Sequence, residues 1–394
     1  MNRSIIRYLL GQVLKIEAML LLLPCIMAVV YQEKEGFAYL ITAGVCGIVG
    51  GLVTIRKPKN TVFYLKEGCV TTALSWICLS FFGALPFLIS GEIPSVTNAL
   101  FETVSGFTTT GASILSDVEA LSHCSNFWRC FTHWIGGMGV LVFLLAIIPL
   151  SGGSNFNLMR AESPGPSVGK LVPKIRTTAR LLYLIYLALT VMEFVFLVAG
   201  RMPVYDAICT SIGTAGTGGF GIKADSMGGY SAYIQWVVTI FMILFGVNFN
   251  AYYFILYKKV KKALKLEEVR YYFLIILVAT GIIFMNLLQT SMGIWDSLRH
   301  AAFQVATIIT TTGYSSCDYS VWPQFSKMIL FLLTVCGASA GSTGGGVKIS
   351  RLLIIVKKIK LDIQKLLHPQ KVEAITMDGK VVDTEVVNQI MAYF

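Results

Sequence analysis

Three short loops rich in threonine and glycine recur along the chain, each between two hydrophobic segments. They occupy residues 108–113, 213–221 and 310–315. In each, a Thr-Gly step follows an apolar segment about half as long as a membrane-spanning helix. Irregular backbone at membrane depth is tolerated only where protein surrounds it or where it lines a water-filled cavity. Glycine supplies positive φ, and a ring of backbone carbonyls can replace the hydration shell of a cation, so the loops predict a cation pore.

Composition predicts a membrane protein. Of the 394 residues, 55% are hydrophobic and only 13% are charged, and the mean hydropathy is +0.70. Soluble proteins carry about 25% charged residues, and about 20 consecutive apolar residues cross a bilayer. We therefore predict an all-α, multi-pass membrane protein that lies in a lipid bilayer.

The net charge of +11 is concentrated in a few segments. Twenty-six of the 32 lysines and arginines fall in the stretches 1–20, 56–66, 151–180, 257–270 and 348–380. Residues 67–128 contain none. Because basic residues gather in short cytoplasmic loops, the pattern predicts a cytoplasmic N-terminus and places the Thr/Gly loops toward the outside. The excess charge indicates topology and contact with anionic lipid, with no nucleic-acid partner.

A unit of outer span, half-length helix, Thr/Gly loop and inner span repeats after an N-terminal pair of spans at 5–31 and 37–55. The three copies of outer span, half-helix and inner span are predicted at 67–90, 96–107 and 127–150, at 178–200, 203–213 and 231–257, and at 271–290, 295–309 and 326–356. Asn98, Asp206 and Asp296 are the predicted N-caps of the half-helices. The C-terminal ends of these helices would direct partial negative charge at a cation.

These elements divide the chain into five parts. The predicted divisions are an N-terminal two-helix hairpin at 1–60, a first pore repeat at 61–157, a second at 158–265, a third with a broken inner helix at 266–370, and a cytoplasmic linker with the start of a fourth repeat at 371–394. Gly111, Gly218 and Gly313 are separated by 107 and 95 residues. The spacing predicts a fourth filter glycine beyond Phe394, so we expect the chain to lack its last quarter.

The sequence contains no convincing catalytic or cofactor-binding pattern. Residues 216–221 satisfy G-x-G-x-x-G without a surrounding βαβ unit, and residues 341–348 lack the Gly-Lys step of a phosphate-binding loop. The nine cysteines form no C-x-x-C pair, and Cys124 and Cys317 are expected to face outward. The acidic D-D-x-x-D motif of polytopic membrane enzymes that act on lipid or prenyl substrates is absent. We therefore predict neither enzymatic activity nor a bound cofactor.

Four polar residues in or near the hydrophobic segments are candidates for a role beside the pore. Glu193 lies inside the second outer span, and a structural or protonated state is favoured over an ion-binding one. Glu102 lies in the first half-helix, where it is close to the ion path and could brace the filter. Arg129 and His133 begin the first inner span and are interpreted as structural or interfacial anchors.

Longer motifs carry a resemblance to a known family. They are the run Phe127-Trp128-Arg129 and residues 134–139, 158–166 and 340–348, together with the three Thr/Gly loops. With these motifs, in order over essentially the whole chain, the sequence resembles the potassium-uptake membrane subunits of the bacterial Trk system (TrkH/TrkG type), within the Trk/Ktr/HKT superfamily.

The resemblance implies four linked units around one pore, a homodimer, and a location in the bacterial cytoplasmic (inner) membrane. Glycine at the key filter positions implies potassium selectivity, whereas serine at the first of them is linked to sodium in plant relatives. The predicted K⁺-binding filter residues are Thr109, Thr110, Gly111, Gly216, Thr217, Gly218, Thr311, Thr312 and Gly313. The resemblance also implies docking of a TrkA-type cytoplasmic ring that binds nucleotides, at basic loops that include Arg160 and residues 170–180.

Small residues interrupt the third inner span between Gly337 and Gly346. Their poor helix propensity predicts a kink or a close-packing face, and the resemblance implies an intramembrane gate below the filter. The predicted gate residues are Gly337, Gly341, Ser342, Thr343, Gly344, Gly345 and Gly346. The sequence thus predicts gated K⁺ uptake, with a sodium or mixed-cation permease, or a non-conducting truncated remnant, as alternatives.

Overall fold

A computed structural model describes residues 1–58, 64–139, 175–368 and 374–394. The chain forms two compact units. Of the described residues, the first comprises 1–58, 64–139, 175–241 and Thr312–Ser316, and the second comprises Met242–Thr311, 317–368 and 374–394. The third Thr/Gly loop is thus divided between them.

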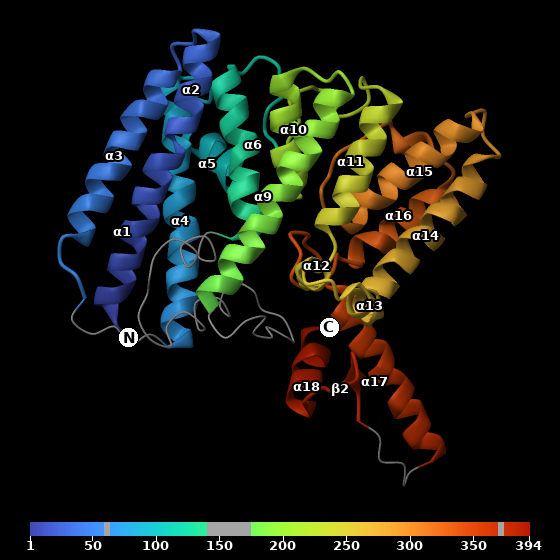
Figure 1. Cartoon of the computed structure of the whole chain (residues 1–394). Coiled ribbons are helices and arrows are strands. Elements are labelled where there is room, and N and C mark those ends of the chain that lie inside the picture. Colours follow the sequence, from blue (N-terminus) through green and yellow to red (C-terminus); the bar gives the residue numbers. More distant parts are fainter. Residues whose placement is uncertain (59–63, 140–174, 369–373) are drawn as a thin grey trace. The chain divides into compact units, whose positions relative to one another are not determined.

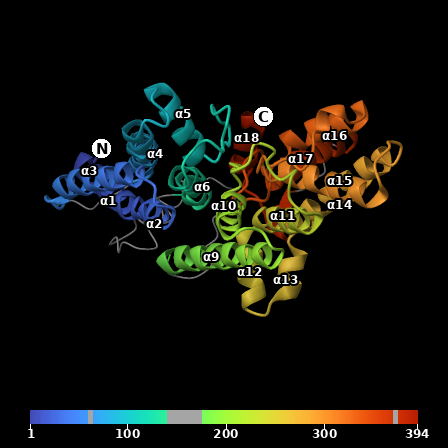
Figure 2. The ribbon, with the colours of Figure 1, turned by 90° about the horizontal axis from the view of Figure 1, so that it is seen from above.

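The N-terminal part of the first unit is a helical hairpin. Its helices are α1 (Arg3–Leu20), α2 (Leu22–Tyr31) and α3 (Gly36–Thr54), with α1 and α3 side by side (Figures 1 and 2). Glycines allow this close approach, because a Cβ on Gly50 would lie 2.8 Å from the Gly11 carbonyl oxygen. The predicted span 5–31 is present as one 29-residue run, Arg3–Tyr31, with a single irregular residue at Leu21 between α1 and α2; Pro24 lies in the first turn of α2, where a missing N–H is tolerated.

The first two repeats follow the predicted order. Copy one has α4 (Leu65–Ser90), α5 (Val96–Phe107) and α6 (His123–Met138), and copy two has α9 (Ile175–Ala199), α10 (Val204–Ala215), α11 (Ala232–Phe245), α12 (Phe249–Leu256) and α13 (Val260–Lys265). Helix α6 begins four residues before the predicted 127, and the rest of the predicted span 127–150 lies outside the described residues. The motif at 158–166 does so as well.

The second inner span, predicted as one helix over 231–257, is broken. Helices α11 and α12 meet at an angle of 91°. The break lies at residues 246–248, where the Asn248 side chain caps α12 by accepting a hydrogen bond from the Asn250 N–H at 2.9 Å. A glycine followed by a good N-cap residue ends one helix and begins the next, and the hydrophobic pattern alone did not reveal this.

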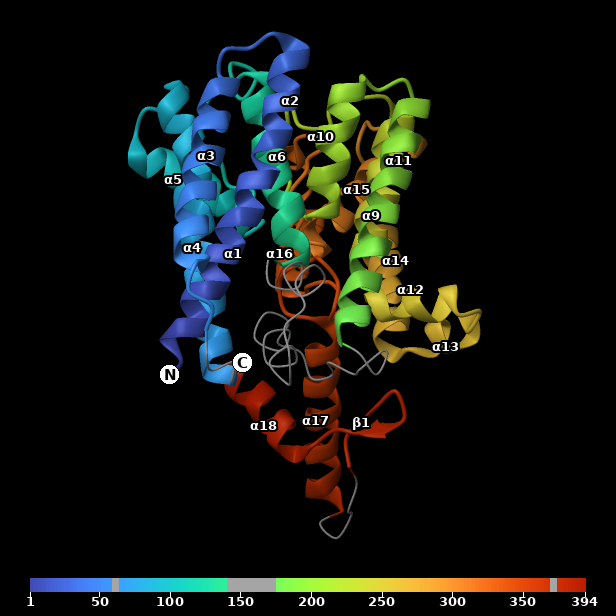
Figure 3. The same cartoon turned by 60° about the vertical axis from the view of Figure 1, so that its left-hand side comes forward.

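The second unit contains the third repeat. Its elements are α14 (Glu267–Leu287), α15 (Ile294–Ile309), the 3₁₀ turn η1 (Tyr319–Val321), α16 (Gln324–Val335), α17 (Ile349–Leu367), the strands β1 (Thr376–Met377) and β2 (Lys380–Val381), and α18 (Thr384–Tyr393). The predicted interruption of the third inner span is confirmed, because α16 ends before it and α17 begins after it. The strands form an antiparallel hairpin beside α17 (Figure 3), turned by Asp378 and Gly379, both with positive φ.

The predicted N-caps of the three half-helices are wrong by the same amount. Asn98, Asp206 and Asp296 occupy the third helical position, and the residues that precede the helices are Ser95, Pro203 and Gly293. In α10 and α15 the acidic side chains of Asp206 and Asp296 in the first turn still complement the positive end of the helix dipole, whereas Asn98 in α5 carries no charge.

Among the described residues, five helices are long and apolar enough to cross a membrane, or six if α11 and α12 count as one bent span. The prediction of a multi-pass helical membrane protein is therefore confirmed. The short helices α5, α10 and α15, with 12, 12 and 16 residues, match the predicted half-helices.

Candidate functional site

The three half-helices end in the same backbone motif. Helices α5 and α10 end at the C-caps Thr108 and Gly216. The N–H of the residue after each C-cap donates to the carbonyl two residues before the cap, and the N–H of the next residue donates to the carbonyl three residues before it. The bonds are Thr109 to Gly106 (3.0 Å), Thr110 to Ser105 (2.9 Å), Thr217 to Thr214 (2.9 Å) and Gly218 to Gly213 (3.2 Å). The N–H of Thr311 likewise bonds the Ile308 carbonyl at 3.0 Å. This is the Schellman ending, which turns the chain sharply out of the helix.

The dihedral angles of the loops repeat as well. Thr109, Thr217 and Thr311 have φ of 55°, 51° and 57°, and Gly111, Gly219 and Gly313, two residues later, have φ of 75°, 81° and 92°. A left-handed threonine is strained and persists only where its surroundings hold it. The repeat therefore aligns Gly219, not Gly218, with Gly111 and Gly313. The predicted residues of the second loop are shifted by one position, because this loop is richer in glycine and gives the sequence no unique register.

The loops of the first unit lie directly against one another. A Cβ on Gly111 would lie 1.9 Å from the Gly218 carbonyl oxygen, and a Cβ on Gly219 would lie 2.0 Å from the Thr312 carbonyl oxygen. The Tyr314 hydroxyl donates toward the Phe220 carbonyl at 3.5 Å, and the Ser315 carbonyl accepts from the Met227 N–H at 2.9 Å. Residues 88 to 107 positions apart are thus brought into direct contact.

A buried ion pair braces the first two loops. Glu102 on α5 and Arg129 on α6 are 1% and 2% exposed, and their closest charged atoms are 2.7 Å apart. Glu102 also accepts hydrogen bonds from the Ser113 hydroxyl at 2.9 Å and the Ile114 N–H at 3.1 Å. One carboxylate therefore fixes the end of the first loop to its own pore helix and to α6.

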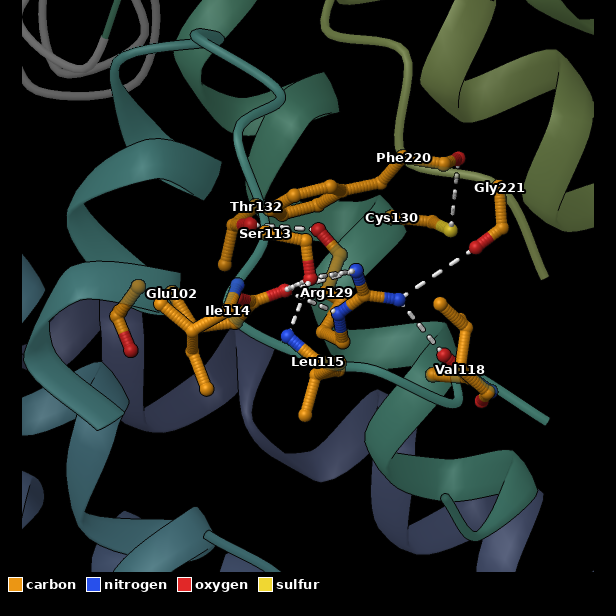
Figure 4. A network of polar contacts seen from close by, with 12 residues as sticks. Glu102, Ser113, Ile114, Leu115, Val118, Arg129, Cys130, Thr132, Phe220 and Gly221 are labelled. Carbon is orange, nitrogen blue, oxygen red and sulfur yellow. Dashed lines mark hydrogen bonds and ion pairs between the residues drawn. The ribbon is translucent and has the colours of Figure 1, made fainter. Parts of the chain in front are cut away.

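Arg129 extends this network to the second loop. Its guanidinium lies 4.2 Å from the centre of the Phe220 ring and donates to the Gly221 carbonyl at 3.5 Å. Figure 4 shows the side chain between Glu102 and Gly221, beside the Phe220 ring. The His133 ring stacks on the Phe220 ring, with 4.2 Å between the ring centres. Both residues are structural, as expected, but Phe220 was not among the predicted site residues.

The predicted gate loop is closed at its neck by backbone bonds. The Gly337 N–H donates to the Val347 carbonyl at 2.6 Å, and the Ile349 N–H donates to the Ala338 carbonyl at 3.3 Å. A Cβ on Gly337 would lie 2.4 Å from the Gly345 carbonyl oxygen, so this position accepts only glycine without rearrangement. Gly341 and Gly346 have positive φ of 68° and 69°.

Within the second unit, the gate loop fills the break between α11 and α12. The Ser339 N–H donates to the Gly246 carbonyl at 3.1 Å, the Thr343 hydroxyl donates to the Phe245 carbonyl at 3.3 Å, and the Phe249 N–H donates to the Gly341 carbonyl at 3.1 Å. A broken helix leaves backbone groups without partners, and in a membrane these must be satisfied by protein. Two broken inner spans satisfy each other here.

The predicted gate loop also contacts the third Thr/Gly turn. The Gly345 N–H donates to the Thr311 hydroxyl at 2.7 Å, and Thr311 donates to the Thr310 carbonyl at 2.7 Å. A Cβ on Gly344 would lie 3.0 Å from the Thr310 carbonyl oxygen. Lys348 reaches back and donates to the Gly344 carbonyl. The structure thus places a predicted gate residue in direct contact with a predicted filter residue.

The structure also describes the two cysteines predicted to face outward and the carboxylate predicted inside the second outer span. Cys124 is buried in the first turn of α6 and Cys317 is half-buried, and neither forms a disulfide with another described cysteine. Glu193 is buried in α9, where no described basic residue forms an ion pair with it. Gly219, Phe220, Asn248 and Glu268 were not predicted, and only the adjacent acids Glu267 and Glu268 at the start of a hydrophobic span gave a sequence signal.

The site offers oxygen atoms from carbonyl and hydroxyl groups. Among the described residues, no group of three or more His, Cys, Asp or Glu side chains could hold a metal ion. Uncharged oxygen ligands suit a weakly hydrated monovalent cation that must bind and leave again.

Comparisons with known proteins show the family to which the chain belongs. Residues 36–394 match the sequence model of the TrkH family, described as a cation transport protein. The chain is 32% identical over 406 residues to the Trk system potassium uptake protein TrkG of Escherichia coli (strain K12), covering 100% of this chain and 83% of that protein. It is 33% identical over 385 residues to the Trk system potassium uptake protein TrkH of Salmonella typhimurium, covering 95% of this chain and 79% of that protein.

A solved structure is similar over the same length. The crystal structure of the potassium transporter TrkH from Vibrio parahaemolyticus matches with a TM-score of 0.89 at 30% identity, covering 100% of this chain and 83% of that one. The predicted fold class, a helical membrane protein with pore-like repeats, is confirmed by this match. The matched proteins are named as transporters and not as enzymes. The chain therefore belongs to the TrkH family of cation transport proteins.

Proposed function

We propose that this chain carries K⁺ inward across the bacterial cytoplasmic membrane through a filter formed by its Thr/Gly turns. The observation that carries the proposal is the threefold repeat of a left-handed threonine followed two residues later by a left-handed glycine. A conformation this strained is maintained at functional sites. The names of the relatives, which are potassium uptake proteins, support K⁺ as the cargo.

The proposed ion-binding groups are backbone carbonyls of the three turns, taken in the register of the dihedral angles. They belong to Thr109, Thr110 and Gly111, to Thr217, Gly218 and Gly219, and to Thr311, Thr312 and Gly313. The ends of α5, α10 and α15 that precede them carry partial negative charge, which favours a cation. The division into an N-terminal hairpin and pore repeats is part of the same proposal.

The proposed gate is the loop 337–346, and the proposed regulator is a cytoplasmic ring of the TrkA type that binds nucleotides. Contact between the gate loop and Thr311 supports a role for the loop in ion passage. The name "Trk system" of the relatives supports a multi-component assembly. A homodimer with the N-terminus in the cytoplasm is the arrangement we propose for the membrane subunit.

Uptake measurements test the proposal. We expect the chain, expressed in a bacterial strain without its own K⁺ uptake systems, to restore growth at low K⁺ and to take up Rb⁺ in preference to Na⁺. Equal Na⁺ and Rb⁺ uptake would favour the mixed-cation alternative, and no uptake by a correctly inserted chain would favour the non-conducting one. A variant with residues 341–345 removed is expected to raise Rb⁺ uptake, and unchanged uptake would contradict gating by this loop.

A further inference from the structure

A single buried carboxylate holds both ends of the gate loop. Glu268, 5% exposed in the first turn of α14, accepts the Ala340 N–H at 2.6 Å and the Ser350 N–H at 3.1 Å on the same oxygen. Ala340 lies near the beginning of the loop, and Ser350 lies just after its end. The other oxygen accepts from the Asn248 side-chain amide at 3.0 Å, at the break between α11 and α12. Hydrogen bonds to an ionised acceptor are the strong ones.

The neighbouring residue, Glu267, faces the cytoplasmic hairpin β1–β2. Its N–H donates to the Asp378 carboxylate at 2.7 Å, and the Asp378 N–H donates back to the Glu267 carboxylate at 3.1 Å. Lys357 on α17 pairs with the same carboxylate and donates to the Thr376 carbonyl at 2.7 Å. Asp378 therefore caps α14 from outside the helix, as an N-cap residue would.

The two acids are consecutive, so the hairpin and the gate loop are attached to the same turn of the same helix. A shift of the hairpin would release the first N–H of α14 and allow this turn to unwind. Glu268 would then leave the positions from which it reaches Ala340 and Ser350. The break in the second inner span would lose its Asn248 contact in the same step.

We propose that Glu268 is the positioning residue that keeps the gate loop against the third filter turn, and that Asp378 on the hairpin controls it through the first turn of α14. The hairpin is then the point at which a cytoplasmic contact acts on the gate. This inference rests on the proposed gating function and adds the path by which the gate is regulated.

The decisive measurement is the accessibility of the loop itself, independent of ion flux. Ser342, half-buried at the middle of the loop, is replaced by cysteine (S342C) in the full chain in lipid nanodiscs. The rate of its modification by N-ethylmaleimide is followed by site-resolved mass spectrometry, with the native cysteines left in place. E268Q keeps the shape of the side chain and removes the charge, and D378A removes the external cap.

We expect E268Q to raise the modification rate of S342C roughly tenfold or more, because bonds to a charged acceptor are each worth about a factor of ten. D378A should raise it less, and should add nothing in the E268Q background. The matched control is D362N, which breaks an exposed ion pair with Lys358 on α17 that does not touch the loop. It should leave the rate unchanged.

Unchanged modification in E268Q that remains folded would overturn the role of Glu268, and additive effects of E268Q and D378A would overturn the path through α14. If E268Q does not fold, N248D keeps the Oδ1 that caps α12 but removes the amide N–H that donates to Glu268, and should raise the rate; no change there would equally overturn the proposal. Rb⁺ uptake is measured on the same variants. Increased modification without increased uptake leaves the holding role intact and contradicts the gating function.

Discussion

At the scale of single residues, one buried ion pair braces the first two Thr/Gly turns of the proposed filter. Glu102 and Arg129 are too deeply buried to be solvated, and each charge is compensated by the other and by surrounding polar groups. The sequence indicated that Glu102 could brace the filter, and the structure supports this by the bonds to Ser113 and Ile114. The sequence did not identify Arg129 as the partner of Glu102, because a loop separates the two residues and their pairing depends on how α5 packs on α6.

Removal of one partner of this pair should be worse than removal of both. We expect E102Q or R129M to lower the unfolding free energy by about 3–5 kcal/mol, since each leaves an uncompensated buried charge. The double variant E102Q/R129M should recover much of the loss. Thermal unfolding of the purified protein in detergent measures the effect, and a double variant as unstable as the sum of the two single ones would contradict it.

At the scale of elements, the Thr/Gly turns of the proposed filter follow short helices, and those after α5 and α10 are Schellman endings. The helices α5, α10 and α15 were predicted within two residues at each end, because an apolar segment bounded by turn residues is a strong local pattern. The glycine of the second turn that corresponds to Gly111 was not predicted, because the sequence alone does not distinguish Gly216, Gly218 and Gly219. Only the backbone dihedrals, and the carbonyl that lies against Gly219, decide it.

Two glycines with the same conformation should respond differently to substitution. A side chain at positive φ costs roughly 1–2 kcal/mol at either Gly111 or Gly313. Only at Gly111 would the new Cβ also meet a carbonyl oxygen, that of Gly218, while at Gly313 it would meet no described atom within 4 Å. We therefore expect G111A to abolish Rb⁺ uptake and to lower the melting temperature more than G313A. Equal melting temperatures for the two variants would show that the close approach is not maintained.

At the scale of the whole molecule, helices far apart in the sequence hold each other's ends. Glu33, in the turn between α2 and α3, accepts the backbone N–H groups of His123 (2.7 Å) and Cys124 (2.9 Å), the first two of α6. Tyr39 on α3 donates to the Ser125 hydroxyl at 2.9 Å. A carboxylate at a helix N-terminus is favoured by unpaired N–H groups and by the helix dipole. The N-terminal hairpin is thus fastened to the first repeat.

The contribution of Glu33 should depend on pH. Burial raises the pKa of this carboxyl, but the hydrogen bonds from Cys124 and His123 outweigh it, so the pKa lies below its usual value. A lowered pKa contributes stability above the unfolded-state value, about 4.3, and this stability is lost as pH falls through the folded-state value. E33Q should therefore lower the melting temperature at pH 7 and have a shrinking effect below about pH 4.

The measurement is the difference in melting temperature between E33Q and the unchanged protein from pH 7 down to pH 3.5. Because the His123 ring also contacts Glu33, at 2.8 Å, the same series is repeated in the H123Q background. A difference that grows toward low pH in both backgrounds would contradict the role of the ionised carboxylate.

The sequence by itself determined the features that depend on residue type and on short spacing along the chain. Hydropathy identified hydrophobic segments long enough to span a membrane, and turn residues located the half-helices and the interruption between α16 and α17. The recurrence of Thr-Gly steps marked the turns that we propose as the filter. These depend on residue type and short spacing alone.

Only the tertiary structure decided which groups meet. The partner of Glu102, the break between α11 and α12, the alignment of Gly219 and the three bonds of Glu268 all depend on contacts between segments separated by tens of residues. A span that looks like one helix in hydropathy can be broken where another segment bonds the freed backbone groups, as at the break between α11 and α12. Which glycine of the second loop corresponds to Gly111 depends on the carbonyl oxygen that lies against Gly219. Which group bonds a freed backbone N–H or carbonyl at membrane depth depends on which segments pack together in the fold. The residue pattern alone therefore could not predict these bonds.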